Sequence, residues 1–222
     1  MNCPFGIKPR WERRKDARPQ ELLAAALDLF VEHGYAATRL EDVARRAGVS
    51  KGTLYLYFEN KEELFKAVVR ESIVPAIGDA EEYIASFEGP SAELLRWVIA
   101  TWWERIGASK ASGISKLLMA EASNFPDLAQ FYRDEVISRA SAMISSMLER
   151  GVARGEFKPM DINVATQVLI APVLMLMLWK HSVGPCDQRI LEPQAYLAQL
   201  TDMVLHGLLT TEQGGGGCAD TR

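Results

Sequence analysis

Hydroxyl and ammonium groups that could hold nucleic-acid phosphates are gathered in one short stretch of this 222-residue sequence. Thr53, Tyr55 and Tyr57 supply the hydroxyl groups, and Lys51 and Lys61 supply the ammonium groups. Such side chains donate hydrogen bonds to phosphate oxygens, and a threonine can also meet a base edge in the major groove. Lys61 stands where a helix is expected to begin, and a helix N-terminus also favours a phosphate. These residues therefore indicate a surface that binds DNA.

Two short helices joined by a glycine turn must position these side chains. Thr38 and Glu41 have the spacing of a capping box, which predicts a helix beginning near Thr38. Gly48 can take the left-handed conformation that ends this helix, and Ser50 can cap the next one. The buried face of the first helix is predicted from apolar residues three and four apart, namely Leu40, Val43, Ala44 and Ala47. The arrangement is a helix-turn-helix, whose second helix commonly enters the major groove.

The sequence over these helices resembles the DNA-binding domain of the TetR-type (TetR/AcrR) transcriptional regulators. The resemblance rests on the run Gly48-Val49-Ser50-Lys51-Gly52-Thr53-Leu54-Tyr55, then on Tyr57-Phe58 and Asn60-Lys61-Glu62-Glu63-Leu64. It is strong over residues 21–67 and only architectural beyond them. It implies an all-α fold of about nine helices, with an N-terminal three-helix helix-turn-helix DNA-binding domain and a C-terminal helical ligand-binding and dimerisation domain.

The resemblance also implies which positions contact DNA. They are Lys51, Gly52, Thr53, Tyr55, Tyr57 and Lys61. Leu56 stands where the family often carries a polar or aromatic residue; a leucine can touch a thymine methyl group but makes no hydrogen bond. Arg39 is a further candidate for a phosphate or base contact, with a solvated surface position as an equally open interpretation. For Tyr55 and Tyr57 the alternative is packing in the core.

The distribution of charge agrees with DNA binding at the N-terminal end. The chain carries a net charge of −4, which is unlike a uniformly basic nucleic-acid binder. Residues 1–61 hold 11 Lys and Arg against 8 Asp and Glu, whereas the remainder holds 14 against 21. The positive excess therefore lies where phosphates would sit, although it is small enough to arise by chance. Residues 1–17 are expected to form a flexible basic arm, either a loose terminus or a minor-groove probe.

Cysteine usage and the N-terminal sequence favour a cytoplasmic protein without a metal site. Cys3, Cys186 and Cys218 are far apart and odd in number, so neither a disulfide framework nor a zinc site is expected. Residues 8–18 are highly charged and no apolar run follows them, so no signal peptide is expected. Residues 163–183 are strongly apolar but contain interrupting polar residues and a proline, which predicts a helix buried on both sides rather than a membrane span.

The remaining sequence is helical in pattern. We expect a helix-turn-helix domain over residues 18–64, a ligand-binding and dimerisation domain over 65–212, and a disordered tail over 213–222. Helices are predicted over 18–34, from Asn60 to near Pro75, from Ser91 (as a cap) to Gly107, and over 117–122, 127–154, 163–183 and 192–211. The last two are apolar on more than one face, which favours a homodimer interface over burial within one chain.

An effector cavity is expected among the helices of the C-terminal half. Large, adaptable side chains suited to it are Trp102, Trp103, Met119, Phe131, Met143, Met147 and Met175, although each alone is more often a core residue, with some of them expected to line the cavity. No cluster of cations points to an acidic ligand, so the expected effector is a small apolar or aromatic molecule. No cofactor is expected.

These features predict a ligand-responsive regulator that binds a palindromic double-stranded DNA operator and is released from it by the effector. The alternative is a helical small-molecule or protein-binding module without specific DNA binding, which salt dependence would distinguish. An enzyme is not expected. His33, His181, His206 and the scattered carboxylates form no catalytic triad, phosphate loop or metal-ligand spacing.

Overall fold

The computed structural model describes residues 17–187 and 191–209, and the regular structure of these residues is helical. A single isolated bridge between Phe157 and Leu209 is the only β-type pairing within these ranges. The predicted all-α fold class is therefore confirmed. Residues 1–16 of the expected arm and the whole of the expected tail, 213–222, lie outside the described residues.

The N-terminal helices are α1 (Ala17–Ala37), α2 (Leu40–Arg46), α3 (Lys51–Tyr55) and α4 (Lys61–Ser72). Gly34 breaks the helical path of α1 with a φ of 83°, and Gly48 ends α2 with a φ of 67°. Ser50 Oγ accepts a hydrogen bond from the Thr53 amide at 3.1 Å, so the predicted cap of α3 is confirmed. Asn60 caps α4 in the same way.

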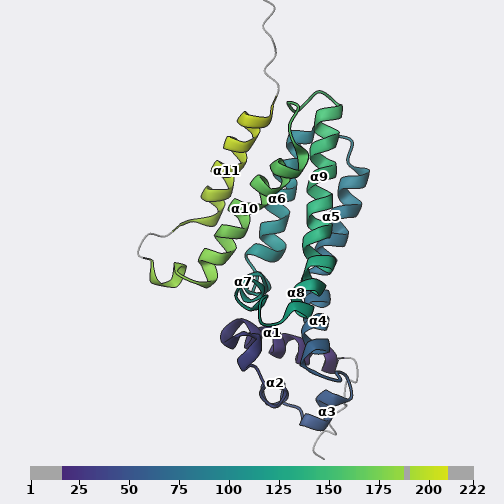
Figure 1. Cartoon of the computed structure of the whole chain (residues 1–222), viewed down its shortest axis with the longest axis vertical. Coiled ribbons are helices and arrows are strands. Elements are labelled where there is room, and N and C mark those ends of the chain that lie inside the picture. Colours follow the sequence, from purple (N-terminus) through teal and green to yellow (C-terminus); the bar gives the residue numbers. More distant parts are fainter. Residues whose placement is uncertain (1–16, 188–190, 210–222) are drawn as a thin grey trace, which may run out of the picture.

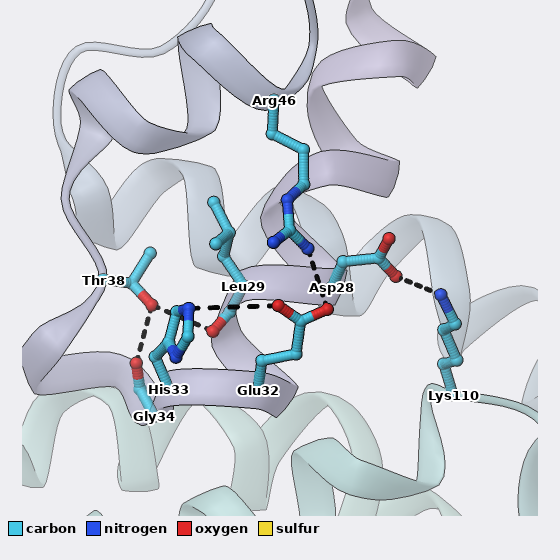
Figure 2. A network of polar contacts seen from close by, with 8 residues as sticks. All are labelled: Asp28, Leu29, Glu32, His33, Gly34, Thr38, Arg46 and Lys110. Atoms are coloured by element: carbon cyan, nitrogen blue, oxygen red, sulfur yellow. Dashed lines mark hydrogen bonds and ion pairs between the residues drawn. The ribbon is translucent and has the colours of Figure 1, made fainter.

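The prediction that Thr38 and Glu41 form a capping box at the start of α2 is wrong. Arg39, not Thr38, precedes the first residue of α2, and it makes no side-chain cap. Thr38 is buried instead, and its hydroxyl lies near the carbonyl oxygens of Gly34 at 2.7 Å and Leu29 at 3.1 Å (Figure 2). The Gly34 carbonyl lies in the last turn of α1, where carbonyls lack a helical partner, so the buried Thr38 hydroxyl bonds there instead of capping α2.

The C-terminal half begins where α4 gives way to a further helix at Ile73. Its elements are α5 (Val74–Ser86), α6 (Ser91–Trp102), η1 (Trp103–Gly107), α7 (Ser112–Glu121), α8 (Pro126–Tyr132), η2 (Arg133–Ile137), α9 (Ser138–Ala153), α10 (Ile162–His181), η3 (Gly184–Cys186) and α11 (Pro193–Leu208). Figure 1 shows α1, α2 and α3 at one end of an elongated molecule, with α4 leading away from them towards α5, α6 and α9. Helix α5 was not among the predicted helices.

Two details of the C-terminal half correct the sequence predictions. Ser91 does not cap α6: Pro90 is the residue before the helix, and the Ser91 amide donates to Glu156 Oε2 at 2.6 Å. Helix α7 begins at Ser112, earlier than expected. The predicted long helix over 127–154 is present as α8, η2 and α9 in succession, with η2 forming a π-helical turn within it.

Helix α10 leaves part of its apolar surface exposed within one chain. It packs against α7 and α9, but Val164, Val168 and Met175 are exposed. Within the described ranges, α10 is the one helix whose length and composition would allow it to cross a membrane; 28% of its most apolar window is buried. The core helices of soluble proteins can have the same length and apolar composition. Helix α11 buries Leu197, Thr201 and Leu205.

Candidate DNA-binding surface and effector cavity

Helix α3 is anchored in the core of the N-terminal helices by Leu54, and the three residues that follow Leu54 are exposed. Leu54 is fully buried, whereas Tyr55, Leu56 and Tyr57 are 44%, 82% and 41% exposed. The alternative that the two tyrosines belong to the core is therefore wrong. Their hydroxyl groups and the Leu56 side chain are accessible for contact with a duplex. This is the geometry of a reader helix, meaning the second helix of a helix-turn-helix, with one face packed in the domain core and the other free to enter the major groove.

The first turn of α3 carries the small and cationic residues expected at the DNA. Lys51 Nζ lies 2.5 Å from Glu41 Oε1 on α2, and this hydrogen bond raises the pKa of Lys51. Thr53 Oγ1 lies 2.9 Å from the Ser50 hydroxyl. A Cβ atom at Gly52 would meet Ser50 Oγ at 3.8 Å, an ordinary contact. Packing within this chain therefore does not require a glycine at this exposed position.

The Lys61 ammonium group, which was predicted to meet a phosphate, is engaged by the chain itself, and its contact with DNA stays a prediction. Its ammonium group donates hydrogen bonds to the carbonyl oxygens of Tyr35, Ala36 and Thr38 at 2.8, 3.2 and 3.1 Å. It also lies 4.5 Å from the centre of the Tyr35 ring. Burial lowers the pKa of Lys61. Its three donors fasten the end of α1 to the start of α4, so they are not directed at a phosphate.

Three arginines near the reader helix are placed differently from one another. Arg46 pairs with Glu32 of α1 at 2.8 Å (Figure 2), and Arg45 pairs with Asp42 at 2.9 Å. Arg39 is exposed at the start of α2, and no ion pair engages it within the described part of the chain. Of the three, Arg39 is the guanidinium most available to a phosphate or base.

A cavity of about 420 Å³ lies among α6, α7, α8, α9 and α10. Of the seven residues predicted to line it, four do: Trp102, Met119, Met143 and Met147. Trp103 is buried elsewhere, with Lys180 above its ring at 5.9 Å. Phe131 faces Lys66 and Arg70 of α4, and Met175 is 57% exposed on α10. These three predictions are corrected because neighbouring residues on the same helices face the cavity instead.

Most of the cavity wall is aliphatic and was not predicted. The additional lining residues are Leu95, Val98, Ile99, Ser115, Leu118, Ala122, Ala129, Tyr132, Val136, Ile137, Ala140, Ser141, Ile144, Gln167, Leu169, Ile170, Val173, Leu174 and Met177. No Asp, Glu, Lys, Arg or His is among the described lining residues. Spacings of three and four residues, as from Ala140 to Met147 on α9, could have identified these faces. Within the described ranges, no group of three or more His, Cys, Asp or Glu residues is placed to hold a metal ion.

The cavity wall is joined to the DNA-binding end by several contacts. The guanidinium of Arg70 on α4 lies 5.0 Å from the Phe131 ring, and Arg70 Nη2 is 3.1 Å from Glu135 Oε1. Phe125, before α8, packs edge-on against Tyr35 with ring centres 4.7 Å apart. Lys110, before α7, forms a 2.6 Å ion pair with Asp28 of α1 (Figure 2). Helices α7 and α8 are thus in direct contact with α1 and α4.

A helix-turn-helix joined to a helical domain that encloses an apolar cavity is the arrangement expected of a ligand-responsive transcriptional regulator. The family model of "Bacterial regulatory proteins, tetR family" matches residues 22–68. The model described as "Tetracyclin repressor-like, C-terminal domain" matches residues 89–204. The chain belongs to the tetR family of bacterial regulatory proteins, and it is a ligand-responsive, DNA-binding transcriptional repressor.

Individual relatives agree with this assignment. The HTH-type transcriptional repressor KstR2 of Mycolicibacterium smegmatis is 28% identical over 200 residues, covering 89% of this chain and 93% of the relative. Two solved structures share the fold. FadR of Bacillus subtilis, in complex with stearoyl-CoA, has a TM-score of 0.71 at 24% identity, covering 85% of this chain and 98% of the other. The ketosteroid regulator KstR2 of Mycobacterium tuberculosis has a TM-score of 0.70 at 23% identity, covering 87% and 96%.

Proposed function

We propose that this repressor acts in the cytoplasm as a homodimer, binds a palindromic operator through α3, and leaves it when an apolar effector enters the cavity. The observation that carries the proposal is that the α8–η2 wall of the charge-free cavity also contacts α4 of the DNA-binding end. We assign DNA binding to residues 18–64 and effector binding and dimerisation to 65–212. Helix α4 crosses that boundary as one continuous element.

A dimer is supported by the unpartnered apolar surface of the last two helices. Val164, Val168 and Met175 on α10 and Met203 on α11 are exposed large apolar side chains. A two-fold axis through such a surface would bury it against its own copy. It would also supply a second reader helix, as two operator half-sites about 34 Å apart require.

The DNA contacts proposed for each protomer come from α3 and its flanks. Tyr55, Leu56 and Tyr57 are accessible, and Gly52 leaves room for close approach of the duplex. Lys51 and Thr53 complete the α3 contacts, with Arg39 reaching from the start of α2. The Lys61 side chain is assigned to positioning, because its ammonium group holds the α1–α2 connection.

The part of the effector inside the cavity is proposed to be apolar and uncharged. A charged group buried among these lining residues would lose its hydration without gaining a counter-ion. Long acyl chains and fused apolar rings fit that chemistry, and the names of the two structural relatives point to the same two classes. Occupation of the cavity would favour a different position of α7 and α8, and therefore of α1 and α4. Operator affinity would fall because the two reader helices no longer match the half-site separation.

Selection from sheared genomic DNA of the source organism tests DNA binding first. The retained fragments are sequenced, and the binding of a recovered site is measured by fluorescence anisotropy at several salt concentrations. A recurrent inverted repeat supports the proposal. Random fragments whose binding disappears at moderate salt would favour the alternative of a binding module without specific DNA recognition.

Effector release is tested on the recovered operator with acyl-CoA thioesters and apolar ring compounds. A compound that binds the protein should lower operator affinity, since binding to the two sites is reciprocally coupled. A compound that fills the cavity tightly and leaves operator affinity unchanged would contradict the release mechanism while leaving DNA binding intact.

A further inference from the structure

The inner wall of the cavity contains one pair of buried hydroxyl groups. Ser115 Oγ on α7 lies 3.1 Å from the Tyr132 hydroxyl on α8, and both residues line the cavity. Each residue is only 7% exposed. The other polar lining residues are more accessible: Ser141 on α9 is half-buried, and Gln167 on α10 is exposed to solvent. The Ser115–Tyr132 pair is therefore the buried polar point among the described lining residues.

One of the two O–H groups of this pair has no acceptor among the described residues. Each hydroxyl can donate one hydrogen bond and accept two. The bond between Ser115 and Tyr132 uses one of their two O–H groups, and the described residues provide no further partner for the other. Burial raises the pKa of Tyr132, so its hydroxyl stays protonated. A buried O–H without an acceptor is unfavourable, and a ligand that brings an acceptor removes that penalty.

We propose that the Ser115–Tyr132 pair binds a carbonyl or hydroxyl oxygen in the uncharged part of the effector that enters the cavity, and so fixes the orientation of its apolar body there. The inference rests on the proposed role of the cavity as the effector site. A carboxylate is excluded at this point, because one neutral donor with no cation nearby cannot replace the hydration of a full charge. A pure hydrocarbon would fill the cavity but leave the donor unpaired, so it would bind more weakly than its oxygen-bearing counterpart.

The position of the pair also suits a signalling role. Tyr132 is the last residue of α8, and its neighbour Phe131 packs against Lys66 and Arg70 of α4. An oxygen held by Tyr132 therefore acts on the same turn that contacts the DNA-binding end. The pair joins α7 to α8, so a ligand that bonds to it also fixes the relative position of these two helices.

Two fluorescent probes separate this proposal from general apolar binding. Prodan is an uncharged dimethylaminonaphthalene that carries a propionyl ketone, and dimethylaminonaphthalene is the same ring system without the ketone. Both are titrated into the full-length protein, into the variant Tyr132→Phe and into the double variant Ser115→Ala/Tyr132→Phe. Tyr83→Phe is the matched control, because Tyr83 stacks on Trp97 outside the cavity. Thermal melting followed by circular dichroism establishes that each variant is folded.

The ketone probe should bind Tyr132→Phe about five- to tenfold more weakly, which is the effect of losing one hydrogen bond. Its bound emission should also move to shorter wavelength, since hydrogen bonding to the ketone shifts it to the red. The ketone-free probe and the Tyr83→Phe control should change by less than about twofold. If neither Tyr132→Phe nor the double variant Ser115→Ala/Tyr132→Phe weakens binding of the ketone probe, the hydroxyl pair does not bind the oxygen although the cavity does take apolar ligands. If neither probe binds the unaltered protein, the proposed effector cavity is itself wrong.

Discussion

The DNA-binding surface and the effector cavity hold their side chains by different means. On α3, the exposed residues Tyr55, Leu56 and Tyr57 belong to one short segment, held by the cap at Ser50 and the buried side chain of Leu54. The cavity instead takes its residues from five helices spread over residues 95–177. The DNA-binding surface therefore depends on local chain geometry and on one buried side chain, whereas the cavity depends on the way in which several helices pack together. Changes at α3 should separate stability from recognition more cleanly than changes at the cavity.

The largest expected effect comes from two leucines that are two positions apart. Leu54→Ala should lower the free energy of unfolding by about 2–5 kcal/mol, because it removes a fully buried side chain and leaves a cavity. Leu56→Ala should change it by less than about 0.5 kcal/mol, because Leu56 is exposed. Urea unfolding measures both, and operator titration of Leu56→Ala measures its contribution to DNA binding. Equal destabilisation by the two variants would mean that α3 is not anchored as the structure has it.

A second pair of variants compares two lysines that had been assigned the same role. Lys61→Ala should lower the free energy of unfolding by about 1–3 kcal/mol, because it leaves three backbone carbonyls without their donor. Lys51→Ala should leave stability nearly unchanged, because its ion pair with Glu41 is exposed.

The salt dependence of operator binding distinguishes the same lysines. The salt slope is the slope of the logarithm of the operator-binding constant against the logarithm of the salt concentration. Lys51→Ala should reduce its magnitude by about one unit, as loss of a phosphate contact does. Lys61→Ala should leave the slope unchanged in protein that remains folded. A reduced slope for Lys61→Ala, with stability preserved, would restore the phosphate contact that its sequence position suggested.

These comparisons show which features could be predicted from sequence. The caps at Ser50 and Asn60 and the turn at Gly48 were predicted because each depends on residues within a few positions. The contacts of the Lys61 ammonium group could not be predicted, because its partners lie 23 to 26 residues away, near Tyr35 and Thr38. Composition and spacing cannot reveal a contact that only tertiary packing creates.

The cavity shows a similar limit within single helices. Trp102 lines the cavity whereas Trp103 does not, and Tyr132 lines it whereas Phe131 does not. Adjacent residues on a helix differ in direction by about 100°, so choosing the wrong neighbour points the side chain at a different element. Both pairs also adjoin a π-helical turn, η1 or η2, which alters the helical phase. The sequence indicated the correct helices, but the facing residue depended on turns that it did not reveal.

Gly52 allows recognition to be altered without loss of stability. Gly52→Ala should raise the free energy of unfolding by about 0.5–1 kcal/mol, because alanine is preferred within a helix and the site has room for a Cβ. Operator affinity should nevertheless fall, since the added methyl group would lie between α3 and the DNA. Unfolding and anisotropy titrations on the same preparation test both effects. A variant that binds the operator normally would show that the duplex does not approach α3 at this position.

The smallest expected effect is a pH dependence at the contact between α10 and α7, where His181 on α10 meets the start of α7. His181 Nε2 lies 2.7 Å from Ser112 Oγ, and burial, together with the nearby charges of Lys180 and Lys116, lowers the pKa of His181 from its ordinary 6.5. The folded protein therefore binds this proton less readily than the unfolded chain does. The contribution to stability is complete above the ordinary pKa and is lost as the pH falls through the lowered one.

Urea unfolding between about pH 7.5 and about pH 5 measures this loss, which His181→Gln should diminish. His206→Gln, at an exposed position on α11, is the control and should keep the original pH profile. Because α7 also packs against α1, the loss should extend to operator binding only if the α7–α10 contact supports the DNA-binding end. A His181→Gln profile identical to that of the unaltered protein would show that acid weakens the fold elsewhere. Operator affinity that stays constant while stability falls would show that this contact supports the cavity domain alone.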